Sequence, residues 1–300
     1  MKVGRSPFLA LGIAAALLAA CTGASPSPSA SASTAASVAA SPSPSVSSIP
    51  APTSLITAGQ LVDCVDIEYP PLEFFPTTDV SNPNAAVGFD VDAAKAAAAL
   101  LGLQITIRNT GFAALIPDLT AGRCDIVWSG LFVSAKRTAV ADVTPYMATG
   151  QVVMVPVGNP KGIHTAADLC GKPVSIQSSG LVEQLINKAS SDCTAAGKAA
   201  INIQGYPKVP DELQQIILGR VDAVWETQEA VADFMSKNPG KYEVAFASSR
   251  DNTYGVYYQK GKADIGVAFA AALRALKADG TLAAFAAKYN LDPTTLDSIK

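Results

Sequence analysis

Short apolar runs alternate with helical patterns in the first half of the folded part of the chain. The apolar runs are typical of strands covered on both faces. They lie at 61–65, 104–108 and 124–129. The helical patterns, one alanine-rich and one opening near a proline, lie at 88–101 and 117–122. The order strand, helix, strand, helix, strand predicts a doubly wound α/β sheet with helices on its faces.

A second series of elements repeats this order. Its predicted strands lie at 151–156, 173–177, 201–206 and 221–225. Its predicted helices lie at 181–189, 211–218 and 226–238, with a capping box at 165–168. An extended segment, a strand and two helices with apolar residues at helical spacing follow at 242–247, 255–259, 265–276 and 281–289.

Two such units predict two lobes joined by two chain crossings, near Gly150 and Ser248. Such a connection permits hinge closure. We therefore expect lobe 1 to comprise residues 55–149 and 248–300, and lobe 2 to comprise residues 150–247. In each lobe, ligands are expected beyond the carboxyl ends of the strands.

The first 20 residues have the pattern of a signal peptide. Lys2 and Arg5 precede an apolar run at 8–20 that is too short to span a bilayer. Leu-Ala-Ala-Cys at 18–21 matches the lipobox of bacterial lipoproteins, which predicts a lipoprotein signal peptide over 1–20 and acylation of Cys21. An ordinary secretory signal is the alternative. We expect an extracytoplasmic protein that is lipid-anchored to the cell membrane.

Residues 22–54 are almost wholly Ala, Ser, Pro and Thr, without charged or aromatic side chains. Such a segment cannot bury enough apolar surface to offset its ordering entropy. We predict a disordered tether over 21–54, beginning with the lipidated cysteine. A flexible coil of this length spans roughly 30 Å.

Charge and the count of metal-ligating residues exclude several classes of protein. Removal of the two cations of the signal peptide changes the net charge from −3 to −5, and the chain has no basic run, so nucleic acid is not an expected partner. The only histidine is His164 and no Cys-x-x-Cys pair exists, so no metal site and no cofactor are expected.

No segment of 55–300 is long and apolar enough for a transmembrane helix. We expect a monomer.

The chain has five cysteines, and four of them remain to form disulfides if Cys21 is acylated. Four cysteines outside the cell are compatible with two disulfides, in three possible connectivities. We favour a local pair and a pair between two neighbouring predicted strands. These are Cys170 with Cys193 and Cys64 with Cys124.

The segment 129–137, Ser-Gly-Leu-Phe-Val-Ser-Ala-Lys-Arg, combines the end of a buried strand, a small-residue turn and the first turn of a helix. Backbone N–H groups at such a position favour an anion, and Arg137 adds a guanidinium whose geometry matches a carboxylate. Taken alone, this pattern is also that of a solvated surface turn. The turns at 66–71 and 111–112 leave the same edge of the predicted sheet and should converge with it.

In this order and spacing, the motifs resemble the polar amino-acid type of extracellular solute-binding protein, which serves ABC transporters. The motifs are 66–74, 88–92, 112–117, 124–130, Arg137, 145–146, 219–222 and 276–281. The resemblance covers 61–289. It implies a periplasmic-binding-protein type II fold with a doubly wound mixed sheet in each lobe, which closes around one small solute and presents it to ABC permease subunits in the membrane.

The resemblance also implies roles for individual residues. Arg137 would bind the α-carboxylate of the ligand, supported by Ser129 and Gly130. Tyr69 and Phe112 would pack aromatic rings against the ligand. Asp66 faces the cleft in this family, where it can bind a cationic side chain.

Three positions depart from the family pattern. Phe132 stands where a serine or threonine usually follows the Ser-Gly turn. In the second lobe, Gly180 stands where a threonine is usual, although Ser179 can substitute for it. Thr227 stands where an aspartate usually holds the α-ammonium, with Glu226 one residue earlier. Adjacent strand residues face opposite sides, so Glu226 replaces that aspartate only if the strand has already ended.

The sequence therefore predicts a binding protein for a small, carboxylate-bearing, amino-acid-like solute, in which Ser179, Gly180, Glu226 and Thr227 close the site from the second lobe. An enzyme resembling cyclohexadienyl dehydratases, on the same fold, is the alternative. It would need an acid in the cleft with a raised pKa, for which Glu226 and Glu68 are the candidates.

Overall fold

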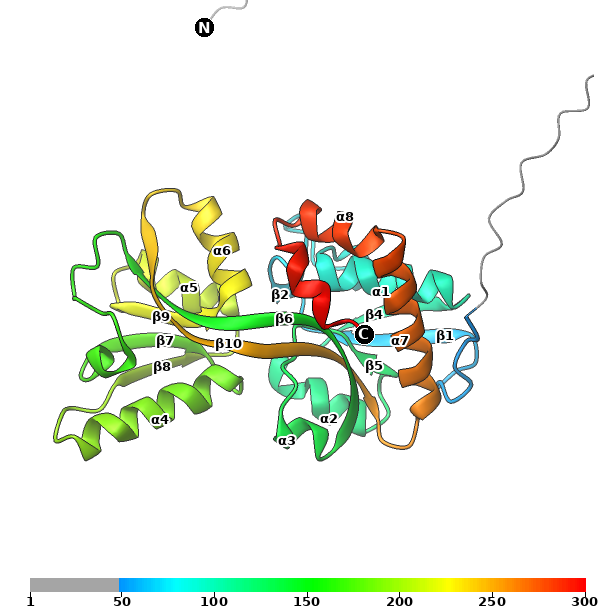
Figure 1. The fold of residues 1–300 in the computed structure, drawn as a ribbon, viewed down its shortest axis with the longest axis horizontal. Coiled ribbons are helices and arrows are strands. Elements are labelled where there is room, and N and C mark those ends of the chain that lie inside the picture. Colours follow the sequence, from blue (N-terminus) through cyan, green and yellow to red (C-terminus); the bar gives the residue numbers. More distant parts are fainter. Residues whose placement is uncertain (1–48) are drawn as a thin grey trace, which may run out of the picture. The chain divides into compact units, whose positions relative to one another are not determined.

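The computed structural model describes residues 49–300, except for the side chain of Arg250 (Figure 1). The predicted signal peptide, Cys21 and most of the predicted tether lie outside the described residues. Within the described part of the chain, every helix is too short or too polar to cross a bilayer.

One eight-stranded sheet runs through the structure in the order β4-β1-β5-β10-β6-β9-β7-β8. The strands are β1 (Gln60–Val65), β4 (Gln104–Asn109), β5 (Ile126–Val127), β6 (Ala141–Pro156), β7 (Pro173–Gln177), β8 (Asn202–Tyr206), β9 (Ala223–Thr227) and β10 (Tyr242–Gln259). β1 pairs in parallel with β4 and β5, and β7 with β8 and β9, whereas β6 and β10 are antiparallel to each other and to their other partners. The predicted mixed α/β fold is confirmed.

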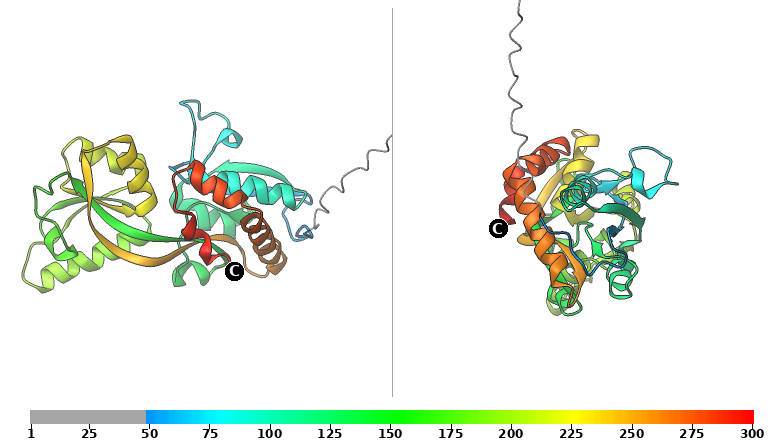
Figure 2. Two further views of the ribbon diagram at one scale, coloured as in Figure 1. Left: turned by 45° about the horizontal axis from the view of Figure 1, so that its top comes forward. Right: turned by 90° about the vertical axis from the view of Figure 1, so that its right-hand side faces the viewer.

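Helices pack around the two ends of this sheet (Figures 1 and 2). We use lobe 1 for the part that contains β1 to β5 and the helices α1 (Phe89–Leu100), α2 (Leu115–Thr120), α3 (Ala135–Thr138), α7 (Ala263–Ala278) and α8 (Thr281–Lys288). Lobe 2 contains β7 to β9 and the helices α4 (Leu181–Ala195), α5 (Val209–Ile217) and α6 (Gln228–Lys237). The short hairpin β2 (Glu68–Tyr69) and β3 (Glu73–Phe74) belongs to lobe 1.

The two long strands β6 and β10 pass through both lobes and pair along their length. Their register shifts at four places, one of them between Ser249 and Asn252, whose partners are Gln151 and Thr149. The predicted crossings at Gly150 and Ser248 thus lie inside continuous strands. The lobe limits given above from the sequence remain a prediction.

Several predicted boundaries differ from the structure. The predicted strand at 151–156 is the second part of β6, which begins at Ala141. The helix that begins at residue 181 continues to Ala195 instead of residue 189, because its polar second half still presents buried Cys193. The segments 242–247 and 255–259 form one strand, β10. The strand β9 extends through Thr227, so α6 begins at Gln228 rather than at residue 226.

Both disulfides have the connectivity favoured from the sequence. Cys64 in β1 is bonded to Cys124, which directly precedes Asp125 and β5. Cys170 is bonded to Cys193 in α4. One disulfide therefore lies in each lobe.

The last residues of the predicted tether contact α7. Thr53 and Ser54 donate hydrogen bonds from their backbone N–H groups to Oδ2 of Asp264, at 2.7 and 2.9 Å. The hydroxyl of Ser54 donates to Oδ1 at 2.5 Å. These bonds, with that of the Ser54 hydroxyl contributing most, hold the pKa of Asp264 well below its usual range. They fasten residues 53–54 to lobe 1.

Candidate ligand-binding site

Loops from both lobes meet beyond the carboxyl ends of β1, β5, β7 and β9. Three polar contacts join the lobes there. The hydroxyl of Tyr69 lies 2.5 Å from Oγ1 of Thr227. Lys208 Nζ lies 2.6 Å from Glu68 Oε1, and Gln177 Nε2 donates to Asp66 Oδ2 at 3.5 Å. The turns predicted to form the site are thus in contact.

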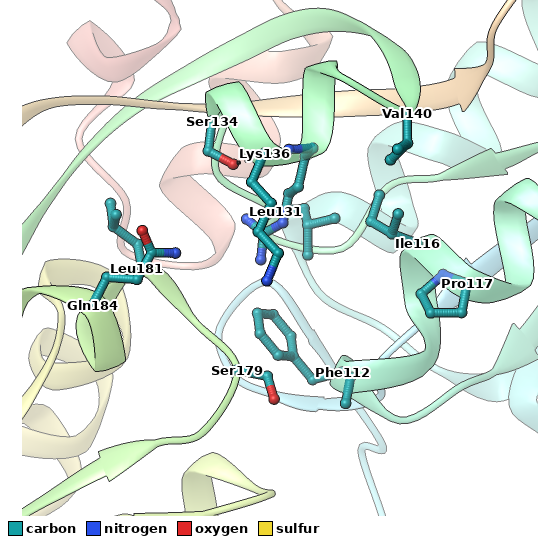
Figure 3. Close-up of a pocket in the computed structure, with 12 residues that line it drawn as sticks. Phe112, Ile116, Pro117, Leu131, Ser134, Lys136, Val140, Ser179, Leu181 and Gln184 are labelled. Carbon is teal, nitrogen blue, oxygen red and sulfur yellow. Dashed lines mark hydrogen bonds between the residues drawn. The ribbon is translucent and has the colours of Figure 1, made fainter. Parts of the chain in front are cut away.

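Two cavities lie at this boundary and share Phe112 and Leu181. The inner cavity has a volume of about 10 Å³ and includes Tyr69, Gly130 and Phe132 from lobe 1 and Gln177, Gly180 and Glu226 from lobe 2. The outer cavity has a volume of about 390 Å³ (Figure 3). Its lining includes Leu131, Lys136 and Arg137 from lobe 1 and Ser179 and Gln184 from lobe 2.

The two predicted aromatic residues take different positions. Tyr69 is 5% exposed, and its hydroxyl is hydrogen-bonded to both Thr227 and the hydroxyl of Tyr254, the latter at 3.0 Å. Burial raises the pKa of Tyr69 well above its ordinary value. Phe112, at the start of a short 3₁₀ turn (Phe112–Ala114), is half-buried and separates the two cavities.

The polar groups of the Ser129-Gly130 turn are bonded within lobe 1. The hydroxyl of Ser129 donates to Glu73 Oε1 at 2.6 Å and accepts the N–H of Asp66 at 2.9 Å. The N–H of Gly130 donates to Asp90 Oδ2 at 2.7 Å. In this structure, therefore, the hydroxyl and the N–H predicted to support a ligand carboxylate are both engaged by groups of the protein itself.

Gly130 is required by its surroundings. Its φ is +50°, in the left-handed region that favours glycine. A Cβ atom at this position would lie 2.5 Å from Cε1 of Tyr69. The turn therefore brings the backbone of residue 130 directly against the aromatic ring.

Arg137 lies in α3, a single helical turn capped by Ser134. Its Nη1 donates to the carbonyl of Phe132 at 3.0 Å, and its guanidinium carbon lies 5.6 Å from the ring centroid of Phe112. Burial lowers the pKa of Arg137 below its ordinary value, and Tyr257 partly offsets this effect. The guanidinium faces the outer cavity rather than the inner one.

Phe132 occupies space next to the inner cavity. Its ring is 5% exposed and packs on Tyr254, with the ring centroids 4.8 Å apart. The carbonyl of Phe132 also accepts a hydrogen bond from the hydroxyl of Tyr257 at 2.5 Å. This residue, which departs from the family pattern, is thus part of the packed core.

The residues predicted in lobe 2 are divided between the cavities. Ser179 has a φ of +68° and lines the outer cavity, and its N–H donates to Glu183 at 2.8 Å. Gly180 lines the inner cavity. Thr227 is bonded to Tyr69, as described above, and is 1% exposed.

Two carboxyl groups lie at the inner cavity or beside it. Glu226 is 3% exposed and its Oε1 accepts the N–H of Thr227 at 2.7 Å; burial raises its pKa to about 7. Asp66 is 4% exposed, and burial followed by the charge of Glu68 raises its pKa to about 7. Among residues 49–300, no cluster of His, Cys, Asp and Glu is arranged to hold a metal ion.

Several site residues were missed in the sequence. Lys136 lines the outer cavity, and its position directly before Arg137 was the signal that could have identified it. Gln177 and Leu181 flank the second-lobe turn. Two buried acids that bond the Ser129-Gly130 turn, Glu73 and Asp90, are both 0% exposed and belong to the motifs 66–74 and 88–92, but the sequence alone does not indicate their role.

Residues 61–292 match the family described as bacterial extracellular solute-binding proteins, family 3. The L-cystine-binding protein TcyJ of Escherichia coli (strain K12) is 26% identical over 232 residues, which are 77% of this chain and 82% of that protein. The arginine-binding protein ArgT of Corynebacterium glutamicum is 24% identical over 247 residues, which are 82% of this chain and 79% of that protein.

Among solved structures, an ancestral arginine-binding protein bound to arginine is similar, with a TM-score of 0.69 at 28% identity. The similarity covers 77% of this chain and 98% of that one. The match of the family to more than three quarters of the sequence, together with the two-lobed α/β architecture, agrees with the resemblance found in the motifs. The chain belongs to the bacterial extracellular solute-binding proteins of family 3.

Proposed function

We propose that this chain is the lipid-anchored substrate-binding component of an ABC importer, and that it captures a small, carboxylate-bearing, amino-acid-like solute between its lobes. Relatives named for binding L-cystine and arginine support the amino-acid class. Another relative, from Escherichia coli, is named ABC transporter arginine-binding protein 1 and is 27% identical over 223 residues. The lipobox at 18–21 supports the anchor.

The observation that carries the proposal is the position of Arg137. Its guanidinium is half-buried at a cavity lined by both lobes. The ion pairs among residues 49–300 do not include it. A partly desolvated guanidinium without a carboxylate partner is suited to a carboxylate supplied by a ligand, which it binds through two parallel hydrogen bonds.

Closure of the lobes supplies the rest of the capture mechanism. A bound solute would contact Arg137 and Phe112 of lobe 1 and Ser179 of lobe 2 together, and would therefore favour the closed arrangement over the open one. The closed form would then be presented to the permease subunits. The anchor at Cys21 and the tether would keep the protein within reach of the membrane.

The test compares Arg137→Ala with Arg123→Ala. Arg123 is exposed, is paired with Asp118 and lines neither cavity, so its loss removes one arginine outside the candidate site. The solute is first identified by thermal-shift screening against amino acids, keto acids and amine-containing osmolytes. Calorimetry should then show that Arg137→Ala weakens binding by about 2–5 kcal/mol, or about 30-fold to 4,000-fold, while Arg123→Ala changes little. Unchanged affinity in Arg137→Ala would refute the assignment.

The dehydratase alternative finds one supporting observation, the raised pKa of Glu226 at the inner cavity. However, that cavity has room for about one water molecule, and the cavity with room for a substrate has no carboxyl group in its lining. The carboxyl group and the space for a substrate thus belong to different cavities. Turnover of prephenate or arogenate that is abolished in Glu226→Gln would reverse this preference.

A further inference from the structure

We infer that the solute is a carboxylate joined to an apolar body, that it lies in the outer cavity, and that Lys136 binds its carboxylate together with Arg137. The inference rests on the proposed function and specifies its solute class. It assigns a ligand contact to Lys136 and makes an α-ammonium on the solute unnecessary.

The space available is the first argument. The inner cavity, at about 10 Å³, admits no more than one water molecule. Phe132 and Tyr69, both 5% exposed, occupy its surroundings. The outer cavity, at about 390 Å³, falls within the range of small-molecule sites. Of the two cavities, only the outer one can hold a solute without repacking buried aromatic rings.

The charge of the lining is the second argument. Lys136 and Arg137 line the outer cavity, and no aspartate or glutamate does. The ion pairs of residues 49–300 include neither of these two cations. Figure 3 shows the side chain of Lys136 extending from α3 toward Phe112 and Ser179. Two unpaired cations at one cavity favour an anionic group on the ligand.

The walls of the cavity are the third argument. In Figure 3, Ile116, Pro117 and Val140 lie on one side, and Leu181 lies on the opposite side. Val140 is 48% exposed. Hydrocarbon placed between these walls would leave water and would cover Val140, which stabilises the complex in proportion to the apolar area buried.

The fourth argument concerns an ammonium group. Glu226 is the carboxyl group that would bind the ammonium in place of the usual aspartate. It lines the inner cavity and not the outer one, and its Oε1 already accepts the N–H of Thr227. The remaining polar residues of the outer cavity are Ser134, Ser179 and Gln184, which are uncharged. A carboxyl group beyond the lining, that of Glu183, already accepts the N–H of Ser179. An ammonium in the outer cavity would therefore meet two cations of the lining and no carboxyl group of the lining, which is unfavourable.

The experiment uses the purified full-length protein and ligands that share one apolar body. The first set is 3-phenylpropanoate, 3-phenylpropylamine and L-phenylalanine, and the second is hexanoate, hexylamine and L-norleucine. In each set, thermal shift and calorimetry should show the carboxylate binding at least tenfold more tightly than the amine and no less tightly than the amino acid. L-Arginine, with a polar cationic side chain, should bind more weakly than the carboxylates.

Substitution of Lys136 and Arg137 tests whether these two cations bind the carboxylate. Lys136→Gln should weaken binding of 3-phenylpropanoate about threefold to tenfold, because Lys136 is exposed and its charge is screened, and Arg137→Gln should weaken it at least about 30-fold. Neither change should weaken binding of 3-phenylpropylamine. Lys172→Gln, on lobe 2 and outside both cavities, is the matched control and should have no effect.

The possible outcomes separate the inference from the proposed function. If L-arginine or the amino acids bind and the simple carboxylates do not, the inference is wrong while the proposed function stands. If neither these ligands nor any amino acid or keto acid of the thermal-shift screen raises the unfolding midpoint, both are wrong. If the carboxylates bind but Lys136→Gln binds them as tightly as the unchanged protein does, the role given to Lys136 is wrong.

Discussion

The inner and outer cavities share the ring of Phe112 but differ in room and in charge. The inner one is small, lies against two packed aromatic rings and contains the buried carboxyl group of Glu226. The outer one is about 390 Å³, lies between apolar walls and is lined by two cations. Phe112 and Leu181 thus lie between a small cavity with a carboxyl group in its lining and a larger cavity with two cations in its lining.

Under the solute class proposed above, this difference sets the preference of the cleft without a change of fold. A small polar residue after the Ser-Gly turn would leave the space that the ring of Phe132 fills. The open volume is instead in the outer cavity, which Arg137 lines.

The largest effect is expected from Phe132→Ala, which would open the inner cavity. Removal of this buried ring should lower the free energy of unfolding by about 3–5 kcal/mol, because its contact with Tyr254 is lost and a cavity remains. Urea denaturation measures the change. Phe112→Ala is the matched variant, and it should lose less stability because that ring is only half-buried. An equal loss of stability in the two variants would contradict the view that Phe132 is packed in the core and Phe112 is not.

Gly130→Ala should lower the free energy of unfolding by about 3 kcal/mol. The alanine would be held in the left-handed conformation, and its Cβ would overpack the turn beside the inner cavity. The added Cβ would meet Cε1 of Tyr69, and that ring cannot retreat while Thr227 and Tyr254 hold its hydroxyl. Gly111→Ala is the control, since its φ is −60° and a Cβ there meets no atom within 4 Å. Thermal unfolding should show a large loss for the first variant and none for the second.

Glu226→Gln should change the dependence of stability on pH. The folded pKa is about 7 and the ordinary value is 4.5, so between these values the folded protein holds a proton that the unfolded chain has lost. The contribution of this group to the free energy of unfolding is therefore full below about pH 4.5 and falls as pH rises through 7, by about 1–3 kcal/mol. The variant lacks this fall.

Urea denaturation at pH 5 and pH 8 measures the effect of Glu226→Gln. The difference in stability between the two pH values should be smaller in the variant than in the unchanged protein. Asp66→Asn removes the carboxyl group of lobe 1 whose pKa is also raised to about 7, and it should likewise reduce the difference in stability between the two pH values. A larger difference in either variant would show that the sign is wrong.

The smallest effect is expected at the contact between Glu68 and Lys208, which joins the lobes at 2.6 Å. Both side chains are substantially exposed, so solvent screens their attraction. A double-mutant cycle with Glu68→Ala and Lys208→Ala should give a coupling of about 0.2–1 kcal/mol in unfolding free energy, reduced further by salt. A coupling above about 2 kcal/mol would mean that this ion pair is a principal link between the lobes.

Much of the fold could be predicted because its signals are local. Apolar runs of strand length, the Gly102 helix end and the Thr165 capping box specify elements that the structure contains. The two disulfides followed from the four cysteines that remain when Cys21 is set aside, and from the predicted adjacency of β1 and β5. The end of β9 could not be predicted, since Glu226 and Thr227 suit a helix start as well as a strand end.

The site was less predictable because it depends on contacts between distant segments. Residues 129 and 130 carry the right groups for an anion, but the sequence does not reveal that Glu73 and Asp90 bond them first. Likewise, Phe132 is visible as a departure, whereas its packing on Tyr254, more than 100 residues away, is not. Lys136 was available as a neighbour of Arg137 but resembles any solvated lysine until the cavity beside it is known.

The pairing of β6 with β10 restricts how the two lobes can move. The strands are hydrogen-bonded from Ala141 opposite Gln259 to Pro156 opposite Tyr242. Sliding one strand by a single residue would break these bonds and turn every side chain to the other face of the sheet. Bending and twisting at an irregular step, such as that between Ser249 and Asn252, would leave most of the bonds intact. Atoms at the entrance of the cleft must therefore travel along arcs about this two-stranded axis, and translation parallel to the strands is not available to them.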